Sequence, residues 1–540
     1  MSSMYDETLS IGAPYGTRRS PIMARNMVAS SHPLAAQAGL RAMDRGGNAI
    51  DAAVAAAITI SVVEPTMNGI GGDGFSLVWD GTQLHGLVGS GKSPHGWTRD
   101  RFAGRNGMPK YGWESVTVPG GVSQWVALSK RFGQLPFADL FEDAIRIIHD
   151  GFAVSPVLAH WWHIAGEELR SQPGFAEAFL PGGRAPRYGE TWRYADQAKT
   201  LTDIAMTNGE SFYRGRLASA IADAARQNGA VLCERDLEEH EASWVTPISQ
   251  GYKGYEMHEI PPSGQGLTAL IALGLLERFN LEEAPRNSAT RMHLQIEAMR
   301  AAFADAHAYI ADPAHMPVSA SDLLDPAYLD ARARLIDPAK AGTYAPGQPP
   351  RGGTTYLCTA DKEGRMVSLI QSNFKHFGSG VVVPGTGIAM HNRGWGFVLE
   401  EGHPNDVGPA KRPYHTIIPG FLTKGGKPVM AFGVMGGLMQ PQGHVQVALR
   451  TILDGDNPQT ALDAPRFRIG DDGRLMLESE VPADVVEQLV AMGHKPIVTS
   501  PGAGVIEYGS GQIIARLSDD LNDGYVAGSD WRRDGQAVGF

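Results

Sequence analysis

The chain has 540 residues, of which 43% are hydrophobic and 19% charged, as in an ordinary folded globular protein. The net charge of −11 argues against a broad nucleic-acid-binding surface. The most apolar stretch, residues 52–63, is much shorter than the roughly 20 residues that a bilayer span requires. Two cysteines, Cys233 and Cys358, are too few for a disulfide scaffold. We therefore expect a cytoplasmic protein with neither nucleic-acid nor membrane partners.

The N-terminal part predicts a leader and two helices. Residues 1–22 are polar and lack the apolar core of a secretory signal, so we expect them to form a loose leader. Pro33 suits the first turn of a helix, and the pair Gly46-Gly47 ends it. Asn48 can cap a second helix that runs to about Val62. This helix is apolar nearly all round, so we expect it to be buried.

A glycine-rich segment precedes an apolar strand over residues 75–79. Gly69, Gly71 and Gly74 match the G-x-G-x-x-G pattern of dinucleotide-binding proteins. That pattern needs a strand before it and a helix after it, whereas here a helix precedes and a strand follows. The sequence therefore predicts a tight glycine turn rather than a nucleotide site.

The middle third is expected to be mainly helical. Apolar residues recur at helical spacing over 137–150, 216–227 and 289–310. The last range contains several charged or titratable side chains, which are typical of a solvated or structural helix face. They are His293, Glu297, Arg300, Asp305 and His307. Residues 337–351 are rich in Pro, Gly and Ala, and we expect them to be irregular and exposed.

Strands are expected to cluster behind that irregular segment. Residues 354–360 and 366–373 flank a turn over 361–364, and residues 387–391 and 428–432 have similar apolar character. Helices early and strands late together predict a layered α/β architecture.

The junction Gly353-Thr354 suggests chemistry of its own. A threonine at the start of a strand, behind flexible glycines, can attack the preceding carbonyl and form an ester by an N→O acyl shift. Hydrolysis of that ester leaves Thr354 as a new N-terminus. Its α-amine, with an ordinary pKa of about 7.7–8.0, can then take the proton of its own hydroxyl. The structural alternative is an ordinary strand start.

The turn length decides which residue faces Thr354 across the hairpin. A three-residue loop at 362–364 places Thr354 opposite Ser372, and a two-residue loop places it opposite Gln371. In both registers the Ser372 hydroxyl lies near the Thr354 hydroxyl. A plain polar strand pair is the alternative interpretation.

A second glycine pair follows an apolar run at the end of an expected strand. The peptide N–H groups of Gly436 and Gly437 have no side chain to block a substrate carbonyl, so they can form an oxyanion hole. Many such pairs are simply turns.

Taken together, these residues resemble the γ-glutamyltranspeptidase family of N-terminal-nucleophile hydrolases. The resemblance extends over most of the chain and is carried by ordered segments. These are GGNAIDAAVA (46–55), EPTMNGIGGDGF (64–75), TVPGGV (117–122), PPSGQG (261–266), the helix 293–312, TTYLCTADKEG (354–364), FGSG (377–380), KRP (411–413) and GVMGG (433–437).

The resemblance implies a four-layer αββα sandwich in which one α/β domain is made from a precursor that cuts itself. The cut would lie between Gly353 and Thr354, giving a large subunit 1–353 and a small subunit 354–540. Thr354 would be the nucleophile, and Ser372 matches a threonine that hydrogen-bonds it. Gly436 and Gly437 match the oxyanion glycines.

The positions that hold a γ-glutamyl group in this family differ here. The arginine that grips the α-carboxylate is replaced by Ser90, and the residues that hold the α-amine by Phe374, Arg393 and Gly396. A cation at 393 should repel an ammonium group and favour a carboxylate. We therefore expect the substrate acid to be bound by Arg393. The supporting residues would be Asn392, Tyr414, His415 and Thr416.

The leading hypothesis is thus a self-processing amidohydrolase that cleaves the amide of a small carboxylate-bearing substrate, most simply oxamate. This pattern is similar to the family branch that includes oxamate amidohydrolases and cephalosporin acylases. The alternatives are a γ-glutamyltranspeptidase or glutathione hydrolase, a glutaryl-type cephalosporin acylase, and an unprocessed binding or scaffold protein. The resemblance implies no metal and no organic cofactor. Its partners would be the two subunits of one precursor, and a dimer of these heterodimers is left open.

Overall fold

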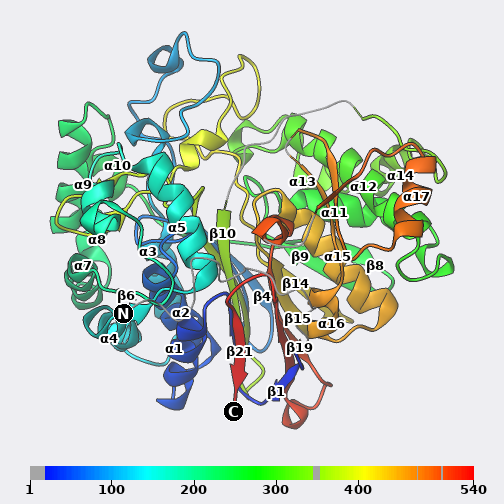
Figure 1. Ribbon diagram of the computed structural model, residues 1–540, viewed down its shortest axis with the longest axis horizontal. Helices are drawn as coiled ribbons and strands as arrows, with labels where there is room; N and C mark the ends of the chain where they lie inside the picture. The colour runs from blue at the N-terminus through cyan, green and yellow to red at the C-terminus, as the bar shows by residue number, and fades with distance from the viewer. Residues whose placement is uncertain (1–18, 345–352, 471, 500–502) are drawn as a thin grey trace.

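The computed structural model describes residues 19–344, 353–470, 472–499 and 503–540, with only the backbone for Gly353, Thr354 and residues 503–505. In this part of the chain, two seven-stranded antiparallel sheets lie face to face (Figure 1). The first sheet has the order β21 (Gln536–Gly539), β2 (Met27–Ser30), β10 (Gly353–Ala360), β11 (Met366–Phe374), β3 (Asp73–Trp79), β4 (Leu84–Gly89) and β7 (Ser243–Val245). The second has the order β1 (Ile22–Ala24), β20 (Tyr525–Ser529), β19 (Gly511–Arg516), β15 (Lys427–Val434), β14 (Gly420–Lys424), β9 (Tyr255–Glu259) and β8 (Ile248–Tyr252).

Helices cover the outer face of each sheet, on opposite sides of Figure 1. The layer beside the first sheet contains α1 (Pro33–Asp44), α2 (Ala49–Val63), α3 (Gly121–Phe132), α4 (Glu142–Asp150), α5 (Pro156–Leu169), α6 (Phe175–Phe179), α7 (Ala195–Met206), α8 (Glu210–Arg214), α9 (Arg216–Gln227) and α10 (Glu234–Glu238). The layer beside the second contains α11 (Gly266–Leu276), α12 (Ala289–Tyr309), α13 (Ala320–Leu323), α14 (Pro326–Ala333), α15 (Met439–Asp454), α16 (Pro458–Asp463) and α17 (Ala483–Ala491). Short strands form smaller sheets: β5 (Phe152–Ala153) with β6 (Thr191–Trp192), β12 (Val382–Val383) with β13 (Ile388–Ala389), and β16 (Phe467–Ile469), β17 (Leu475–Glu478) and β18 (Ile497–Thr499).

The apolar core follows this layering. One buried cluster joins the first helical layer to its sheet, and another joins the second layer to the other sheet. A third lies between the two sheets and includes Phe75, Tyr356, Phe421 and Ile514. Each sheet is therefore covered on both faces, and the expected αββα sandwich is confirmed.

The helix α2 shows how local sequence produces this layering. Asn48 accepts hydrogen bonds from the backbone N–H groups of Ile50 and Asp51, and the Asp51 carboxylate accepts from Asn48 N–H, which completes a capping box. All fifteen residues of the helix are buried, as its all-round apolar sequence predicts. The helices expected at 33–45 and 216–227 are also confirmed.

Several expectations need correction. The leader was expected to extend to residue 22, but Ile22 already pairs with Ala527 in β1; residues 1–18 lie outside the described part. Of the strand expected at 387–391, only Ile388–Ala389 forms. Residues 137–150 divide into a short 3₁₀ segment, Phe137–Phe141, followed by α4. Strands are not confined to the later part of the chain, because β2, β3, β4, β8 and β9 complete sheets whose centres come from residues after 352.

Candidate functional site

Thr354 occupies an irregular position in the first sheet. From Thr355 to Ala360, β10 pairs with β11 in the register of the three-residue turn, with Thr355 opposite Gln371 and Ala360 opposite Met366. At the end of the strand the register shifts, and Gly353 lies opposite Phe374. Between these two pairs Thr354 alone stands opposite Ser372 and Asn373, so the irregularity is a β-bulge whose extra residue lies on β11. Such bulges occur beside active sites, where they redirect a side chain.

Ser372 lies across the hairpin from this bulge. It is fully buried on β11, and its Oγ accepts a hydrogen bond from the backbone N–H of Phe374 at 2.7 Å. On its other side, Ser372 pairs with Asp73 of β3. The predicted neighbourhood of residues 354 and 372 thus follows from the backbone register alone.

The next residue, Thr355, is held firmly in place. Its hydroxyl donates to the carbonyl of Gln371 at 3.0 Å and accepts from the Asn68 amide at 2.8 Å. Asn68 is fixed in turn because its Oδ1 accepts the backbone N–H of Gly69 at 2.7 Å. The glycine-rich segment after α2 therefore supports the strand that carries the predicted cleavage junction.

Close packing of other parts of the chain explains why glycines occur in that segment. A Cβ on Gly71 would lie 2.4 Å from the Ala389 carbonyl oxygen, and one on Gly74 would lie 2.0 Å from the Gln124 side chain. The carbonyl of Gly72 accepts the N–H groups of both Gly120 and Gly121. The prediction of a turn without nucleotide-binding context is consistent with this arrangement, since the glycines allow other segments to approach closely.

Gly436 and Gly437 form the turn between β15 and α15. Their φ angles of 117° and 63° fall in the left-handed region, which explains why glycine occupies both positions. The carbonyl of Gly437 accepts a hydrogen bond from Gln265 at 2.8 Å, which restrains the turn. Within the described residues, neither peptide N–H of this pair has a hydrogen-bond partner. Both donors are therefore available to an oxyanion.

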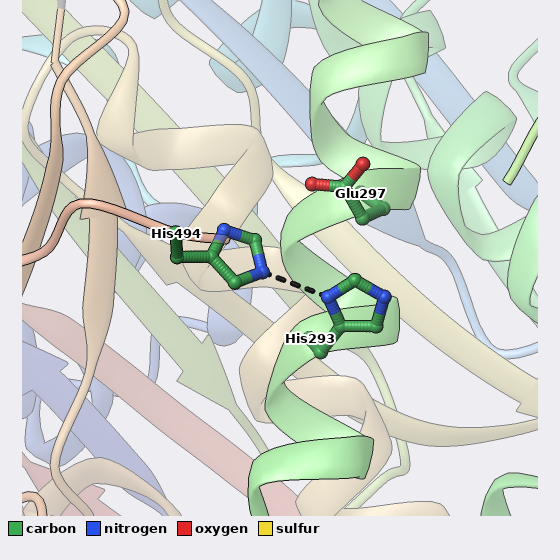
Figure 2. Close-up of side chains that lie close together, drawn as sticks. All are labelled: His293, Glu297 and His494. Carbon is green, nitrogen blue, oxygen red and sulfur yellow. Dashed lines mark hydrogen bonds between the residues drawn. The ribbon is translucent and has the colours of Figure 1, made fainter. Parts of the chain in front are cut away.

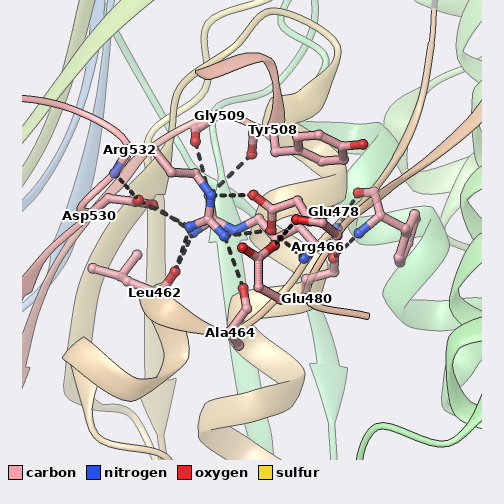
Figure 3. A network of polar contacts seen from close by, with 12 residues as sticks. Leu462, Ala464, Arg466, Glu478, Glu480, Tyr508, Gly509, Asp530 and Arg532 are labelled. Carbon is pink, nitrogen blue, oxygen red and sulfur yellow. Dashed lines mark hydrogen bonds and ion pairs between the residues drawn. The ribbon is translucent and has the colours of Figure 1, made fainter. Parts of the chain in front are cut away.

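A buried polar network lies next to the Gly436-Gly437 turn (Figure 3). Arg466 donates to the carbonyls of Tyr508 and Gly509, each at 3.1 Å, and to the Asp530 carboxylate at 2.8 Å. Arg532 binds Glu478 and Asp530 in the same network. Gly509 packs against Gly436, where the nearest backbone atom would lie 3.2 Å from an added Cβ. The network thus stabilises the shape of the Gly436 turn.

Arg393, the predicted substrate-binding residue, forms an ion pair with the buried carboxylate of Asp73. Its Nε–H donates to both oxygens of Asp73 at 3.0 and 2.9 Å, and Nη1 donates to the Thr416 hydroxyl at 3.0 Å. His415 donates Nε2–H to Asp73 at 2.5 Å. Within the described residues the second terminal nitrogen, Nη2, has no partner. The structure thus brings Arg393, His415 and Thr416 together around Asp73.

The charges in this cluster are well defined. Burial raises the pKa of Asp73, but the Arg393 guanidinium and His415 more than offset it and hold that pKa well below its ordinary value. Burial, together with the nearby Arg393, lowers the pKa of His415 to about 4. At neutral pH the cluster therefore contains an aspartate, an arginine cation and a neutral histidine.

Asn392 and Tyr414 lie apart from that arrangement. Asn392 donates its amide to the Lys110 carbonyl at 2.8 Å and accepts the Lys375 N–H at 3.1 Å. The Tyr414 hydroxyl donates to Gln265 Oε1 at 3.2 Å. Each side chain is already engaged with protein groups, and each supports neighbouring backbone or the glutamine that restrains Gly437.

Sequence reasoning missed two groups. The sequence pattern places Asp73 only in a glycine turn. The one available signal for a buried ion pair is that a charged residue stands among glycines directly before an apolar strand. The titratable face of α12 was expected to be a solvated or structural helix face, yet His293, Glu297 and Asp305 are all buried, so only the structural interpretation holds. Spacing alone gave no indication of what these residues bind.

His293 and Glu297 meet His494 in a compact cluster (Figure 2). One ligand-type atom from each lies within 4.8 Å of the others, and His293 Nδ1 is 2.7 Å from His494 Nε2. Such donors suit a transition metal. Glu297 already accepts the Gly342 N–H at 2.7 Å and the Tyr344 hydroxyl at 3.1 Å. The cluster thus holds Gly342 and Tyr344, which lie shortly before the predicted cleavage junction at Gly353-Thr354.

Comparison with known proteins agrees with this architecture. The αββα sandwich, with two antiparallel sheets between helical layers, is the fold of the N-terminal-nucleophile hydrolases. The family model described as Gamma-glutamyltranspeptidase matches residues 35–540. The chain belongs to the γ-glutamyltranspeptidase family and is an amide hydrolase of that family.

Three relatives cover nearly the whole chain. A glutathione hydrolase-like YwrD proenzyme of Bacillus subtilis is 36% identical over 97% of this chain and 100% of its own. An oxamate amidohydrolase proenzyme of Klebsiella pneumoniae is 35% identical over 96% and 99%. The crystal structure of a cephalosporin acylase from Bacillus halodurans is 47% identical, covers 98% of both chains and has a TM-score of 0.93. Relatives named as proenzymes accord with a chain made as a precursor.

Among the helices of the described residues, none combines the length and the apolar character that crossing a membrane would require.

Proposed function

We propose that the chain cuts itself between Gly353 and Thr354 and that Thr354 is then the nucleophile of an amidohydrolase. The observation that carries this proposal is the β-bulge at the start of β10, where Thr354 stands opposite both Ser372 and Asn373 instead of one regular partner. In the precursor, Thr354 Oγ attacks the Gly353 carbonyl and the Thr354 nitrogen leaves as an amine. Water hydrolyses the resulting ester, which frees the Gly353 carboxylate and the Thr354 amine.

The same groups would then act on substrate. Thr354 Oγ attacks the amide carbonyl while its own amine takes the hydroxyl proton. The N–H groups of Gly436 and Gly437 stabilise the oxyanion. The proton passes to the leaving amine, and water releases the acid from the acyl ester. Ser372 holds the nucleophile by a hydrogen bond.

The substrate is a small amide that bears a carboxylate, and oxamate is the first candidate. The Nη2 of Arg393 supports this assignment, because it is a buried donor with no acceptor among the residues that the structure describes. Thr416 contacts the guanidinium and His415 binds its partner Asp73, while Asn392 supports neighbouring backbone and Tyr414 binds Gln265. Hydrolysis of glutathione-like γ-glutamyl compounds and cephalosporin acylase activity are the alternative functions, as the names of two relatives suggest.

Self-cleavage is tested on a denaturing gel of the purified wild type. We expect fragments of 353 and 187 residues, with Thr354 as the first residue of the smaller one. Thr354→Ala should give one full-length band and no turnover, and Thr355→Ser, with an unchanged hydroxyl on the same strand, should still be cut. A single band from folded wild type would instead indicate an unprocessed binding or scaffold protein.

Substrate choice is tested by comparing two amides. We expect ammonia release from oxamate to be faster than aniline release from a γ-glutamyl anilide. Faster turnover of the anilide would contradict the assignment of Arg393 as a carboxylate anchor.

Arg393→Ala should raise the KM for oxamate. An unchanged kcat/KM for oxamate would show that Arg393 does not bind the substrate carboxylate.

A further inference from the structure

A compact group of three buried side chains takes no part in the proposed chemistry. His293 and Glu297 lie on α12 and His494 follows α17, and one ligand-type atom from each lies within 4.8 Å of the others (Figure 2). His293 and Glu297 are fully buried, and His494 is 3% exposed. Because residues four positions apart on a helix share a face, His293 and Glu297 form a chelating pair on one side of α12. The third donor comes from a distant part of the chain.

The hydrogen bonds of His293 determine where its proton lies. Its Nε2 is 2.9 Å from the Asp337 carbonyl oxygen, which can only accept, so Nε2 carries the proton. The lone pair of Nδ1 then accepts from His494 Nε2 at 2.7 Å. Histidines that bind metal ions commonly donate their other ring N–H to a backbone carbonyl in this way. His293 therefore has the tautomer and the outer hydrogen-bond partner of a metal ligand.

His494 can present the nitrogen that metal binding requires. Its Nδ1 is buried and has no hydrogen-bond partner within the described residues. If its proton moves from Nε2 to Nδ1, the imidazole stays neutral and the Nε2 lone pair faces that of His293 Nδ1. In a tetrahedral zinc site with bonds of about 2.0–2.1 Å, ligand atoms lie about 3.3 Å apart. The two nitrogens, now 2.7 Å apart, therefore need to separate by about 0.6 Å.

Glu297 supplies the negative charge of the group. Its Oε2 accepts hydrogen bonds from the Gly342 N–H at 2.7 Å and from the Tyr344 hydroxyl at 3.1 Å. Such bonds orient a carboxylate and leave it lone pairs for a metal ion. Arg300 Nη1 lies 3.3 Å from the other oxygen, Oε1, and the Arg300 side chain is 22% exposed. This cation opposes a bound metal ion, so the sign of its effect on binding is a test of the site.

We propose that His293, Glu297 and His494 bind one divalent transition-metal ion, with Zn²⁺ as the first candidate. Two imidazoles and one carboxylate form a donor set that suits zinc and leave a fourth position for water. The proposal does not depend on the proposed function, because the three residues lie neither at the Gly353-Thr354 junction nor at the Gly436 turn.

The ion would join parts of the chain that lie on both sides of the predicted cleavage junction. The helix α12 precedes the junction, and His494 follows it. The backbone of residues 337–344 contacts both parts, through the His293 ring at 2.9 Å and the Met492 carbonyl at 2.8 Å. In a processed chain the ion would thus connect the large subunit, the small subunit and the segment that ends at the cut.

Metal binding is measured on the purified wild type after treatment with a chelator and removal of that chelator. Titration calorimetry with Zn²⁺ should show saturable binding of one ion per chain. Co²⁺ in the same site should give the intense visible absorption of a four-coordinate ion. Absence of saturable binding at Zn²⁺ concentrations up to about 100 μM would overturn the proposal.

Variants assign the ion to these residues. Glu297→Gln keeps a carbonyl oxygen for the Gly342 N–H but loses the charge. His494→Gln keeps an N–H donor for His293 Nδ1 but loses the imidazole. Each should weaken Zn²⁺ binding by about tenfold or more, whereas His163→Gln, which changes an exposed histidine, is the matched control and should bind as the wild type does. Unchanged binding in both cluster variants would overturn the site.

Arg300→Gln distinguishes a bound cation from a group that only forms hydrogen bonds. Removal of the positive charge beside Glu297 should tighten Zn²⁺ binding by about threefold or more, because like charges repel. Unchanged or weaker binding in this variant would contradict a metal ion at the Glu297 carboxylate.

Hydrogen exchange tests where the ion lies. The Gly342 amide donates to Glu297, so Zn²⁺ at about ten times its Kd should slow the exchange of this amide by about tenfold in the wild type. The same addition should leave Gly342 unchanged in His494→Gln. If Zn²⁺ does not slow this amide in the wild type, the ion does not bind at Glu297 and the proposal is overturned.

Discussion

Asp73 and Arg393 form a fully buried ion pair although 320 positions separate them in the chain. The pair joins the start of β3, before the junction, to the loop after β13, behind it. In a processed chain it would connect the two subunits. Arg393 also lies over the ring of Phe374, with its guanidinium carbon 4.6 Å from the ring centroid. The carboxylate therefore fixes the orientation of a cation that we assign to substrate binding.

Asp73→Asn should strongly destabilise the protein, because it leaves the Arg393 cation buried without its counter-charge. Losing one partner of a buried pair is destabilising by about 3–5 kcal/mol. We expect a decrease of that order in the free energy of unfolding, measured by urea denaturation. The double variant Asp73→Asn/Arg393→Met removes both charges and should be destabilised by less than the sum of the single variants. Additive effects would show that the two side chains do not interact.

Gly436→Ala should reduce activity more than stability. A Cβ at φ 117° is strained, and the methyl group would lie in the turn whose N–H is proposed to bind the oxyanion. Loss of one oxyanion donor lowers kcat by about 10²–10³-fold. Gly455→Ala is the matched control, since Gly455 also has a positive φ, of 64°, but nothing lies within 4 Å of an added Cβ. Similar kcat values for both variants would argue against an oxyanion role.

The sequence predicts best where structure is local. The start of α1 at Pro33 and the Asn48 cap of α2 follow from a few neighbouring residues. The order of strands does not, because β10 lies between β2 and β11, and β2 in turn pairs with the C-terminal β21. Such long-range pairing depends on which faces remain uncovered after the helices have packed, and no short pattern records that.

The same distinction applies to the site. The proposed roles of the Gly353-Thr354 junction and of the Gly436-Gly437 turn each depend on adjacent residues, so local patterns can indicate them. Asp73 is different, since its role depends on side chains that other loops bring to it.

Four buried histidines should make the fold sensitive to mild acid. Burial lowers the pKa of His32 and His415 to about 4 and of His240 and His444 to about 3. Below pH 6.5 the unfolded chain binds protons that the folded chain does not. Stability should therefore fall as the pH decreases from about 6.5 toward 4, by up to about 1.4 kcal/mol per pH unit for each histidine.

Urea midpoints measured between pH 7.5 and pH 5 test this prediction. His240→Gln can keep a hydrogen bond to Ser123, which the histidine ring makes at 2.9 Å, but cannot be protonated. Its unfolding free energy should depend less steeply on pH than that of the wild type. An identical pH dependence in the two proteins would show that His240 contributes nothing to acid sensitivity.

Glu297→Ala should release the segment that precedes the cleavage junction. Glu297 accepts hydrogen bonds from the Gly342 backbone and the Tyr344 hydroxyl, and His293 binds the Asp337 carbonyl at 2.9 Å. Without the carboxylate, residues 337–344 lose contacts to α12, so the Gly342 amide should exchange with solvent about tenfold or more faster, as loss of one charge-assisted hydrogen bond predicts. Gln295→Ala, on the same helix, is the control, because among the described residues that side chain donates only to the Arg291 carbonyl of its own helix. Equal exchange at Gly342 in both variants would mean that other contacts hold this segment against α12.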